Sequence, residues 1–215
     1  MKKGLFITME GPDGSGKSTQ LDFLKDYFEK RGEKALFTRE PGGTPISEKI
    51  RNVILDKENL EMDSVTEAFL YAASRAQLVS QVIKPALERG RTVVCDRYVD
   101  SSIAYQGYGR KLGDMVEKIN TFATQECEPD ITFLLKLDSQ KGIKRIEESS
   151  EQRGEKDRLE EETISFHNDV LMGYMELEKK YPDRIIGIDA NKSIEEVRTI
   201  IEDKLNYYFG VRNNV

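Results

Sequence analysis

The chain has 215 residues, 33% of them charged, with a formal net charge of -6 and a pI of about 5.1. Such an acidic chain argues against nucleic-acid or anionic-membrane binding through a broad basic face. Because no Pro/Gly/Ser-rich linker divides it and no stretch is long and apolar enough to span a membrane, we expect one cytoplasmic α/β domain over residues 1–215. Cys95 and Cys127 lack C-x-x-C spacing, which favours two reduced core thiols.

The first predicted element is a buried strand over Leu5–Met9 that leads into a glycine-rich loop. The loop from Gly11 to Ser18 fits G-x-x-x-x-G-K-[ST], and a helix is predicted over Ser18–Lys30. Inward-turned backbone N–H groups and the helix N-terminus would hold phosphate, with Lys17 on β and γ oxygens and Ser18 offering a hydroxyl to Mg²⁺. The loop indicates a nucleotide phosphate site, but it does not tell a kinase from a GTPase or a motor.

A second strand, predicted at Ala35–Thr38, is followed by a loop that begins where a parallel strand ends, and ligands gather at such ends. Thr44 then caps a helix with proline in its first turn. Ser64 and Glu67 form a capping-box pattern for a helix over Val65–Ser74, and a further helix runs on to the glycine at position 90.

Asp96 directly follows the third predicted strand, Thr92–Cys95. An acidic residue there can hold Mg²⁺, directly or through water, against the phosphates that Lys17 contacts. The alternative is a helix cap or an ion pair with Arg97. The phosphate loop favours the metal role.

The segment Ser101–Gly113 is rich in glycine and polar aromatic residues, which is typical of an irregular segment that shapes a pocket. Tyr105, Gln106 and Tyr108 are its candidate ligand contacts. A helix is predicted next, near Asp114–Glu126. Its expected core residues are Met115, Ile119 and Phe122.

A fourth strand, Ile131–Leu137, precedes a densely charged stretch from Lys141 to Glu162. One interpretation is a helix face exposed to water. The other is a mobile lid over about residues 142–160, whose arginines swing onto a transferring phosphoryl group and exclude water.

The last predicted elements are a helix to Lys180, a strand over Arg184–Ile188 and a helix capped by Ser193 with Glu196. Strands separated by helices, with the phosphate loop on the first strand, predict a parallel sheet with helices on both faces. The NKSI sequence at 191–194 lacks the final Asp of a guanine-reading Asn-Lys-x-Asp. We therefore favour a small-molecule kinase over a GTPase.

Six segments, taken in order, resemble the bacterial thymidylate kinases, which are P-loop nucleoside monophosphate kinases that make dTDP from dTMP. They are EGPDGSGKST, TREPGGT, FLYAASRAQL, DRYVDSSIAYQGYGR, RGEKDRLE and IDA. The resemblance runs from about Leu5 to Leu205. It implies a three-layer P-loop kinase fold with a five-stranded parallel sheet and a mobile lid. It also implies ATP as donor, dTMP as acceptor, Mg²⁺ as cofactor, a role in dTTP synthesis and a homodimer, with no nucleic-acid or membrane partner.

The resemblance also implies the site residues. The expected ATP-binding residues are Gly11, Pro12, Asp13, Gly14, Ser15, Gly16, Lys17, Ser18, Thr19 and Arg145. The expected substrate-binding residues are Glu10, Arg39, Arg51, Tyr71, Ser74, Arg75, Arg97, Ser102, Tyr105 and Gln106. The expected catalytic residues are Lys17, Arg97, Arg153, Arg158 and Asp13, and the expected metal ligands are Ser18 and Asp96.

Within these sets, the resemblance places Arg51 and Arg97 on the dTMP phosphate and Arg75 and Gln106 on the thymine edge. Tyr71 stands at the base-stacking position, where the family often has Phe.

Two further roles follow from the resemblance. Tyr105 would crowd the sugar C2′. Since the phosphate loop lacks an arginine, Arg153 of the lid is the first choice for the transition-state cation and Arg158 the second.

Two other functions stay open at this point. A deoxynucleoside kinase would phosphorylate an uncharged hydroxyl, which would leave two phosphate-gripping arginines surplus. A non-catalytic P-loop regulator would keep the phosphate loop but need a partner.

Overall fold

The computed structural model describes residues 4–153 and 157–213, with the backbone alone at 149–153 and 211–213. Within these residues, five parallel strands form one sheet in the order β2-β3-β1-β4-β5. The strands are β1 (Phe6–Glu10), β2 (Leu36–Arg39), β3 (Val93–Asp96), β4 (Ile131–Lys136) and β5 (Ile185–Asp189). Each was predicted to within one residue at either end. The parallel sheet of the predicted fold class is confirmed.

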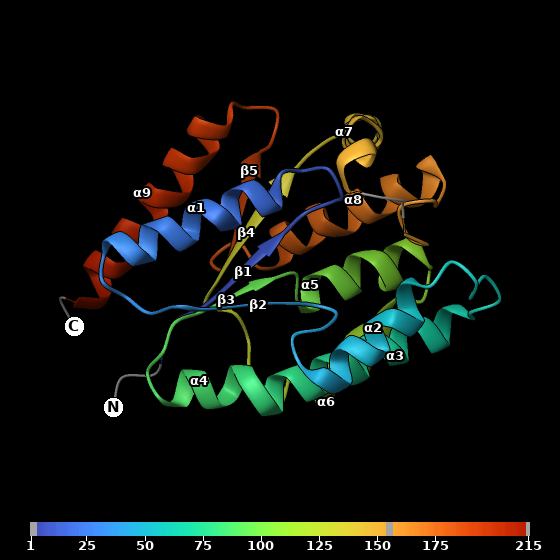
Figure 1. Cartoon of the computed structure of the whole chain (residues 1–215), viewed down its shortest axis with the longest axis horizontal. Helices are drawn as coiled ribbons and strands as arrows, with labels where there is room; N and C mark the ends of the chain where they lie inside the picture. The colour runs from blue at the N-terminus through green and yellow to red at the C-terminus, as the bar shows by residue number, and fades with distance from the viewer. Residues whose placement is uncertain (1–3, 154–156, 214–215) are drawn as a thin grey trace.

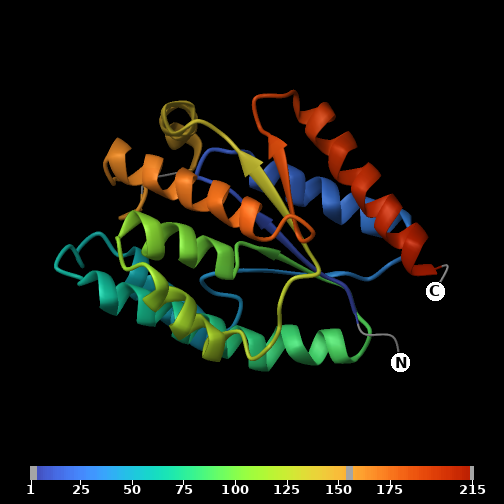
Figure 2. The same cartoon turned by 180° about the vertical axis from the view of Figure 1, so that it is seen from behind.

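Helices cover both faces of this sheet (Figure 1). They are α1 (Lys17–Lys30), α2 (Pro45–Leu55), α3 (Ser64–Leu78), α4 (Lys84–Glu88), α5 (Val99–Ser102), α6 (Asp114–Ala123), α7 (Ser139–Arg153), α8 (Ile164–Lys180) and α9 (Ile194–Asn213), with π-helical segments η1 (Val79–Ile83) and η2 (Ile103–Gly109). The first and last helices, α1 and α9, lie side by side on one face, and the view from behind shows α8, α5 and α6 on the other (Figure 2). The predicted three layers are therefore present.

The sheet separates two apolar cores, because neighbouring side chains of a strand point to opposite faces. Ile7 of β1 packs into the core beneath α1 and α9 with Phe28, whereas Phe6 packs into the core beneath α8 with Tyr98. Burial of each such side chain contributes about 1.5–3 kcal/mol. Neither cysteine forms a disulfide, and both are buried, as predicted. In the described part of the chain, no helix has both the length and the apolar character to cross a membrane.

The predicted cap of α2 is confirmed, since the Thr44 hydroxyl accepts a hydrogen bond from the Ser47 N–H at 3.1 Å. The predicted cap of α3 is wrong. This helix begins one residue earlier, and the Asp63 carboxylate accepts the hydrogen bond from the Val65 N–H at 2.8 Å. Glu67 therefore does not complete a capping box, and its carboxylate is buried elsewhere.

The prediction of an irregular segment at Ser101–Gly113 is wrong over most of its length, because α5 and η2 form a nearly continuous helix there. The wide turns of η2 include a hydrogen bond from the Arg110 N–H to the Tyr105 carbonyl at 2.9 Å. Such π-helical turns often occur at functional sites. Tyr108 packs against the core and does not line the cavity described below.

The predicted core face of α6 is also wrong. Phe122 is 84% exposed, and the buried residues of α6 are Val116, Asn120 and Ala123, one position further along. The rotation has a polar cause: the buried Asn120 accepts a hydrogen bond from the Arg75 guanidinium, so this face must turn inward.

Candidate active site

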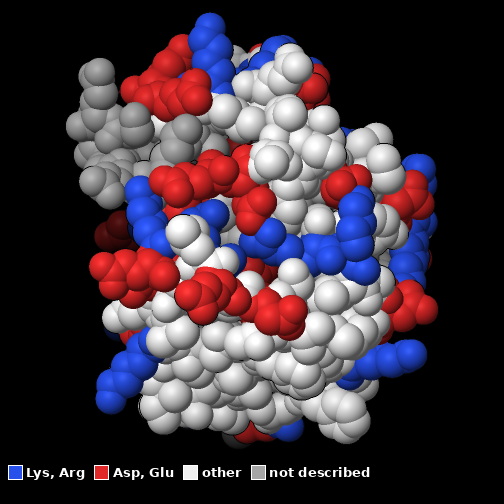
Figure 3. Space-filling view, turned by 90° about the vertical axis from the view of Figure 1, so that its right-hand side faces the viewer, with Lys and Arg blue, Asp and Glu red and all other residues white. Residues whose placement is uncertain are grey.

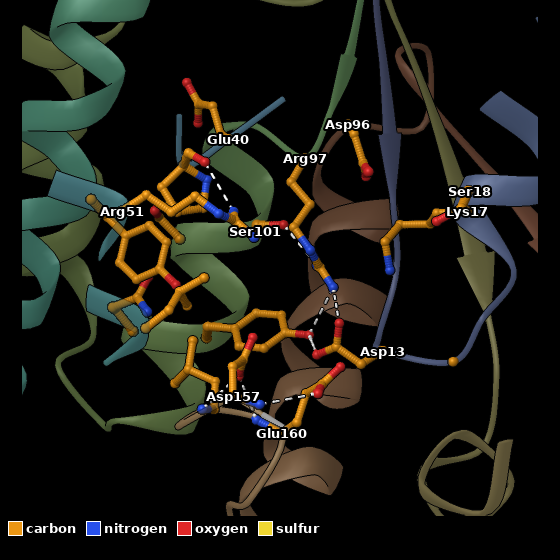
Figure 4. Close-up of a pocket in the computed structure, with 18 of the residues that line it drawn as sticks. Asp13, Lys17, Ser18, Glu40, Arg51, Asp96, Arg97, Ser101, Asp157 and Glu160 are labelled. Atoms are coloured by element: carbon orange, nitrogen blue, oxygen red, sulfur yellow. Dashed lines mark hydrogen bonds and ion pairs between the residues drawn. The ribbon is translucent and has the colours of Figure 1, made fainter. Parts of the chain in front are cut away.

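A cavity of about 500 Å³ lies among the carboxyl ends of the central strands, the start of α1 and the helices α2, α3 and η2. In Figure 4, Lys17 and Ser18 lie on one side, Glu40 and Arg51 on the other, and Arg97 between them. Figure 3 views the molecule from the side of α7 and α8, and basic and acidic side chains lie close together across this face.

Most of the predicted residues line this cavity. They are Asp13, Gly14, Gly16, Lys17, Ser18, Thr19, Arg51, Tyr71, Asp96, Arg97, Ser102, Tyr105, Gln106 and Arg145. Gly11, Pro12 and Ser15 belong to the same phosphate loop but do not reach the cavity surface.

The phosphate loop ends in a glycine because Gly16 caps α1 with a φ of 92°, a backbone conformation that glycine adopts readily. The ammonium group of Lys17 donates hydrogen bonds to the Gly11 and Pro12 carbonyls at 3.0 and 2.9 Å. Burial and, to a lesser extent, the nearby charge of Arg97 lower the pKa of Lys17 to about 8. Lys17 thus lies folded over the phosphate loop and lines the cavity.

The start of α7 packs directly on the phosphate loop. A Cβ atom on Gly14 would lie 2.5 Å from the Gly142 carbonyl oxygen, so only a glycine permits this approach. Arg145, one turn further along α7, reaches the Gly14 and Ala190 carbonyls at 3.4 and 3.3 Å and lines the cavity. The helix that begins the predicted lid is therefore in contact with the loop.

Arg97 joins the phosphate loop to η2. Its φ of 64° lies in the left-handed region, which costs a non-glycine residue about 1 kcal/mol or more. Its guanidinium pairs with Asp13 at 2.5 Å and donates to the Tyr105 hydroxyl at 3.2 Å, and the Tyr105 hydroxyl donates to Asp13 at 2.7 Å. Burial alone would raise the pKa of Asp13, but the charges of Arg97 and Lys17 hold it well below its usual range. Asp13 is therefore a carboxylate.

Glu10 lies beneath Arg97 and is fully buried, so it does not reach the cavity as a substrate contact would. Its carboxylate accepts hydrogen bonds from the Ser101 and Tyr174 hydroxyls at 2.6 and 3.0 Å. Both hydroxyls also lie 3.1 Å from Arg97 Nη1. Burial and, to a lesser extent, the charge of Asp100 raise the pKa of Glu10 to about 7. Glu10 thus supports Arg97 from behind.

Gln106 and Arg51 border the far end of the cavity with Tyr71, which is half-buried. The Gln106 amide donates to Glu67 at 2.9 Å, and its Oε1 atom is buried with no hydrogen-bond partner among the described residues. Arg51 donates to the Pro41 carbonyl at 3.0 Å. This end of the cavity therefore has an aromatic ring and, buried in its wall, an acceptor without a hydrogen-bond partner in the described residues.

Arg75 does not line the cavity, although a contact with the thymine edge was predicted. It is 1% exposed, and all three guanidinium nitrogens are engaged. Nε and Nη2 pair with the Glu40 carboxylate at 2.8 and 2.5 Å. Nη2 also donates a hydrogen bond to the Tyr98 carbonyl. Nη1 donates to the Ser102 hydroxyl at 3.0 Å and to the Asn120 side chain. Arg75 instead holds Glu40 and Ser102, which do line the cavity.

Two more predicted substrate contacts lie outside the cavity. Arg39 pairs with Glu48 at 2.9 Å, and its side chain is 51% exposed. Ser74 is fully buried, and its hydroxyl accepts a hydrogen bond from the Gly42 N–H at 3.2 Å. Both therefore shape the loop after β2.

The two lid arginines differ. Arg158 is 7% exposed and points away from the cavity, since it pairs with Glu67 at 2.5 Å and donates to the Ile54 carbonyl at 3.0 Å. It is not placed here as a cation for a transferring phosphate. The side chain of Arg153 lies outside the described residues.

Several cavity residues were missed by sequence reasoning. They are Glu40, Pro41, Leu55, Ser101, Asp157, Leu159 and Glu160. All except Leu55 fall inside the motif segments quoted above, so the signal was present. All of these residues are acidic or uncharged, and the pattern of a phosphate site indicates only its cations.

Asp96 and Ser18, the two predicted metal ligands, lie at the same cavity. The Oδ1 atom of Asp96 is buried without a hydrogen-bond partner in the described part of the chain, and Ser18 lines the same cavity. No group of three or more His, Cys, Asp or Glu side chains gathers there among residues 4–153 and 157–213. One carboxylate and one hydroxyl suit Mg²⁺, which keeps several waters and binds phosphate oxygens.

Residues 9–201 match a family profile described as "Thymidylate kinase". A thymidylate kinase from Bacillus cytotoxicus is 47% identical over 208 residues, covering 94% of this chain and 99% of the relative. One from Lactobacillus delbrueckii subsp. bulgaricus is 50% identical over 197 residues, covering 91% and 92%. The crystal structure of thymidylate kinase from Ehrlichia chaffeensis matches with a TM-score of 0.75 and 30% identity, covering 94% of this chain and 99% of that chain.

Proposed function

The chain belongs to the thymidylate kinase family and phosphorylates dTMP to dTDP with ATP, and we propose how the residues of its cavity divide this reaction. The observation that carries the proposal is that one cavity joins the phosphate loop to an aromatic end through Arg97. A phosphoryl donor and a nucleotide acceptor can then meet in line.

The phosphate loop binds the donor. Its backbone N–H groups and the N-terminus of α1 hold the ATP phosphates. Lys17 exchanges the Gly11 and Pro12 carbonyls for β and γ oxygens and stabilises the charge that spreads during transfer. Arg145, on the exposed edge of the cavity, lies against adenine.

Ser18 and Asp96 hold Mg²⁺ on the donor side. The support is the unpaired, buried Oδ1 atom of Asp96, which lies across from Lys17 and Ser18 (Figure 4). A bound Mg²⁺ would neutralise phosphate charge. The Ser18 hydroxyl and the Asp96 carboxylate would hold that cation, directly or through water.

Arg97 and Arg51 bind the acceptor phosphate. Arg97 already lies between the phosphate loop and the aromatic end, and its planar fork suits two phosphate oxygens. Asp13 and Tyr105 hold this fork at the place where the two phosphates meet, next to the deoxyribose.

The thymine ring occupies the far end. Tyr71 stacks on it, and the unpaired Oε1 atom of Gln106 accepts a hydrogen bond from N3–H. Ser102 contacts the edge of the base. Arg75 does not touch the base itself, but its hydrogen bond to the Ser102 hydroxyl holds Ser102 in position.

Transfer proceeds in line, with no covalent enzyme intermediate. Residues 142–160 form the lid of a single domain, and closure excludes water that would compete as acceptor. Arg153 supplies the transition-state cation in this proposal, because Arg158 is bound to Glu67.

The protein assembles as a homodimer through α3 and α6. These helices pack together and present Phe69 and Phe122, which are 56% and 84% exposed. A Phe122→Glu variant should sediment as a monomer in analytical ultracentrifugation, whereas an unchanged sedimentation coefficient would contradict this interface. Cys95 and Cys127 are buried and form no disulfide, which suits a reducing compartment, and we place the enzyme in the cytoplasm.

A coupled ADP-release assay tests the proposal. ATP and Mg²⁺ are supplied with dTMP, dUMP, dCMP, dGMP, AMP or thymidine as acceptor. The proposal predicts a strong preference for dTMP and no turnover of thymidine, because Arg97 and Arg51 need a phosphate. Comparable turnover of thymidine would contradict the assigned acceptor-phosphate site.

A further inference from the structure

Glu67 of α3 lies behind the base end of the cavity and is 1% exposed, without lining the cavity itself. Three side chains bind its carboxylate. Oε1 accepts from Gln106 Nε2 at 2.9 Å and from Arg110 Nε at 3.2 Å. Oε2 accepts from Arg110 Nη2 at 3.0 Å and from Arg158 Nη2 at 2.5 Å. A carboxylate this buried needs such partners, and here it has them.

Glu67 is ionised. Burial would raise the pKa of Glu67, but the hydrogen bonds and charge of Arg110, with the hydrogen bonds from Gln106 and Arg158, bring it below its ordinary value. An ionised carboxylate can only accept hydrogen bonds. Gln106 must therefore turn its NH₂ group toward Glu67.

This orientation decides what Gln106 offers to a ligand. With its NH₂ group engaged by Glu67, the atom left over is Oε1, which is buried and has no partner in the described residues. Gln106 lines the cavity, so its open group is a hydrogen-bond acceptor. Without a fixed neighbour, an amide could rotate and present either group.

Resting on the proposed placement of the base, we propose that Glu67 is the positioning residue for base selection, because it fixes Gln106 as an acceptor at the base end of the cavity. An acceptor there complements the N3–H donor of thymine or uracil. The N3 atom of cytosine carries no hydrogen and is itself an acceptor, so the same contact repels it.

The same carboxylate also fastens the segment that follows α7. Arg158 bridges Glu67 and the Ile54 carbonyl of α2, while its neighbour Leu159 lines the cavity. Loss of Arg158 should therefore loosen the cavity wall for every acceptor alike. Loss of the Glu67 charge should change the choice between bases. The two kinds of effect separate the role of Glu67 in fastening the cavity wall from its role in orienting Gln106.

The decisive variant is Glu67→Gln. Two arginine N–H groups converge on Oε2, so the new amide oxygen should take that place and the new NH₂ group should face Gln106. Gln106 would then reverse and present its own NH₂ group to the cavity. We expect the ratio of kcat/KM for dTMP to that for dCMP to fall about tenfold, with the dCMP value unchanged or raised.

Two further variants serve as controls. Glu162→Gln neutralises the other carboxylate on Arg110, at 2.5 Å, but touches neither Gln106 nor Arg158, so the dTMP/dCMP ratio should stay at the wild-type value. The double variant Glu67→Gln/Arg158→Met removes one buried anion with one buried cation. It should fold where the single variant does not. Without Arg158 one Arg110 N–H faces each side of the new amide, so Gln106 is free to present either group and the ratio should still fall, by less than in the single variant.

The Gln106→Leu variant separates this inference from the proposed function. If Gln106→Leu lowers the dTMP/dCMP ratio while the Glu67 variants keep it, the base lies where proposed and the role of Glu67 is overturned. If Gln106→Leu also leaves the ratio unchanged, the placement of the base itself is contradicted. An equal fall in the ratio for Glu162→Gln would likewise overturn the role of Glu67.

Discussion

The two ends of the cavity are built in different ways. The donor end is one continuous stretch, Gly11 to Thr19, whose backbone N–H groups and single ammonium are proposed to bind the charged phosphates of ATP. The base end takes side chains from α2, α3 and η2, and their orientation depends on buried ion pairs of Glu67 and Glu40.

This difference predicts how substitutions at each end of the cavity change enzyme activity. The phosphate loop uses backbone N–H groups, so binding at the donor end should depend little on side chains elsewhere in the protein. Loss of Lys17 should slow the transfer step itself, because its charge stabilises the transferring phosphate. The base end depends on partners behind the surface, so substitutions of residues that never touch the substrate should change acceptor use. Four substitutions test this contrast.

The largest effect is expected at the donor end. Lys17→Ala should lower kcat by about 100- to 1,000-fold, because no other described lysine lines the cavity to stabilise the transferring phosphate. Steady-state ADP release with saturating ATP and dTMP measures this change. Lys25→Ala is the control, because Lys25 lies on the exposed side of α1, where it pairs with Asp22. This variant should turn over at the wild-type rate. A Lys17→Ala enzyme of normal kcat would remove Lys17 from the mechanism.

Arg97→Lys should come next, with kcat/KM for dTMP about 100-fold lower. A lysine keeps the charge but loses the fork that reaches Asp13 and Tyr105 together. Arg39→Lys is the matched control, because Arg39 only pairs with an exposed carboxylate of α2. Equal losses in the two variants would contradict a special role for the fork of Arg97.

Tyr174→Phe should lower kcat/KM for dTMP about tenfold without contact to substrate. Its hydroxyl lies 3.1 Å from Arg97 Nη1 and 3.0 Å from Glu10, so the variant loosens Arg97 and leaves the ring in the core. Tyr207→Phe, at a side chain 73% exposed, should have wild-type kinetics. Wild-type kcat/KM in Tyr174→Phe would show that Arg97 needs no support from this side.

The smallest effect concerns pH. Since burial raises the pKa of Glu10 from 4.5 to about 7, the folded protein holds a proton there that the unfolded chain releases. Between these values the folded state binds more protons, so stability falls as pH rises, on the order of 2 kcal/mol. Urea unfolding at pH 5 and pH 8 should show this loss in the wild type and a smaller one in Glu10→Gln. An identical pH dependence would contradict the raised pKa.

Most of the fold could be predicted because its signals are local. Apolar runs gave the strands to within one residue, and the Thr44 and Ser193 caps lie where short-range patterns put them. Errors arose where a distant partner decides the outcome. The α6 helix turns Phe122 outward because Arg75 of α3 requires Asn120 as an acceptor.

The residues of the candidate site show the same difference between local signals and distant partners. The phosphate loop and Asp96 could be placed from residue order alone, since a strand delivers them to a known edge of the sheet. Sequence order did not tell which arginines face the cavity. Arg97 does, whereas Arg75 and Arg158 are bound by Glu40 and Glu67 from distant segments.

Titration calorimetry with dTMP alone, on Lys17→Ala and Arg97→Lys side by side, tests the division of the cavity most directly. Our account predicts that Lys17→Ala binds dTMP within about twofold of wild-type affinity, whereas Arg97→Lys binds about tenfold or more weakly. Equal weakening in both variants, or a loss confined to Lys17→Ala, would contradict the separation of a donor end from an acceptor end.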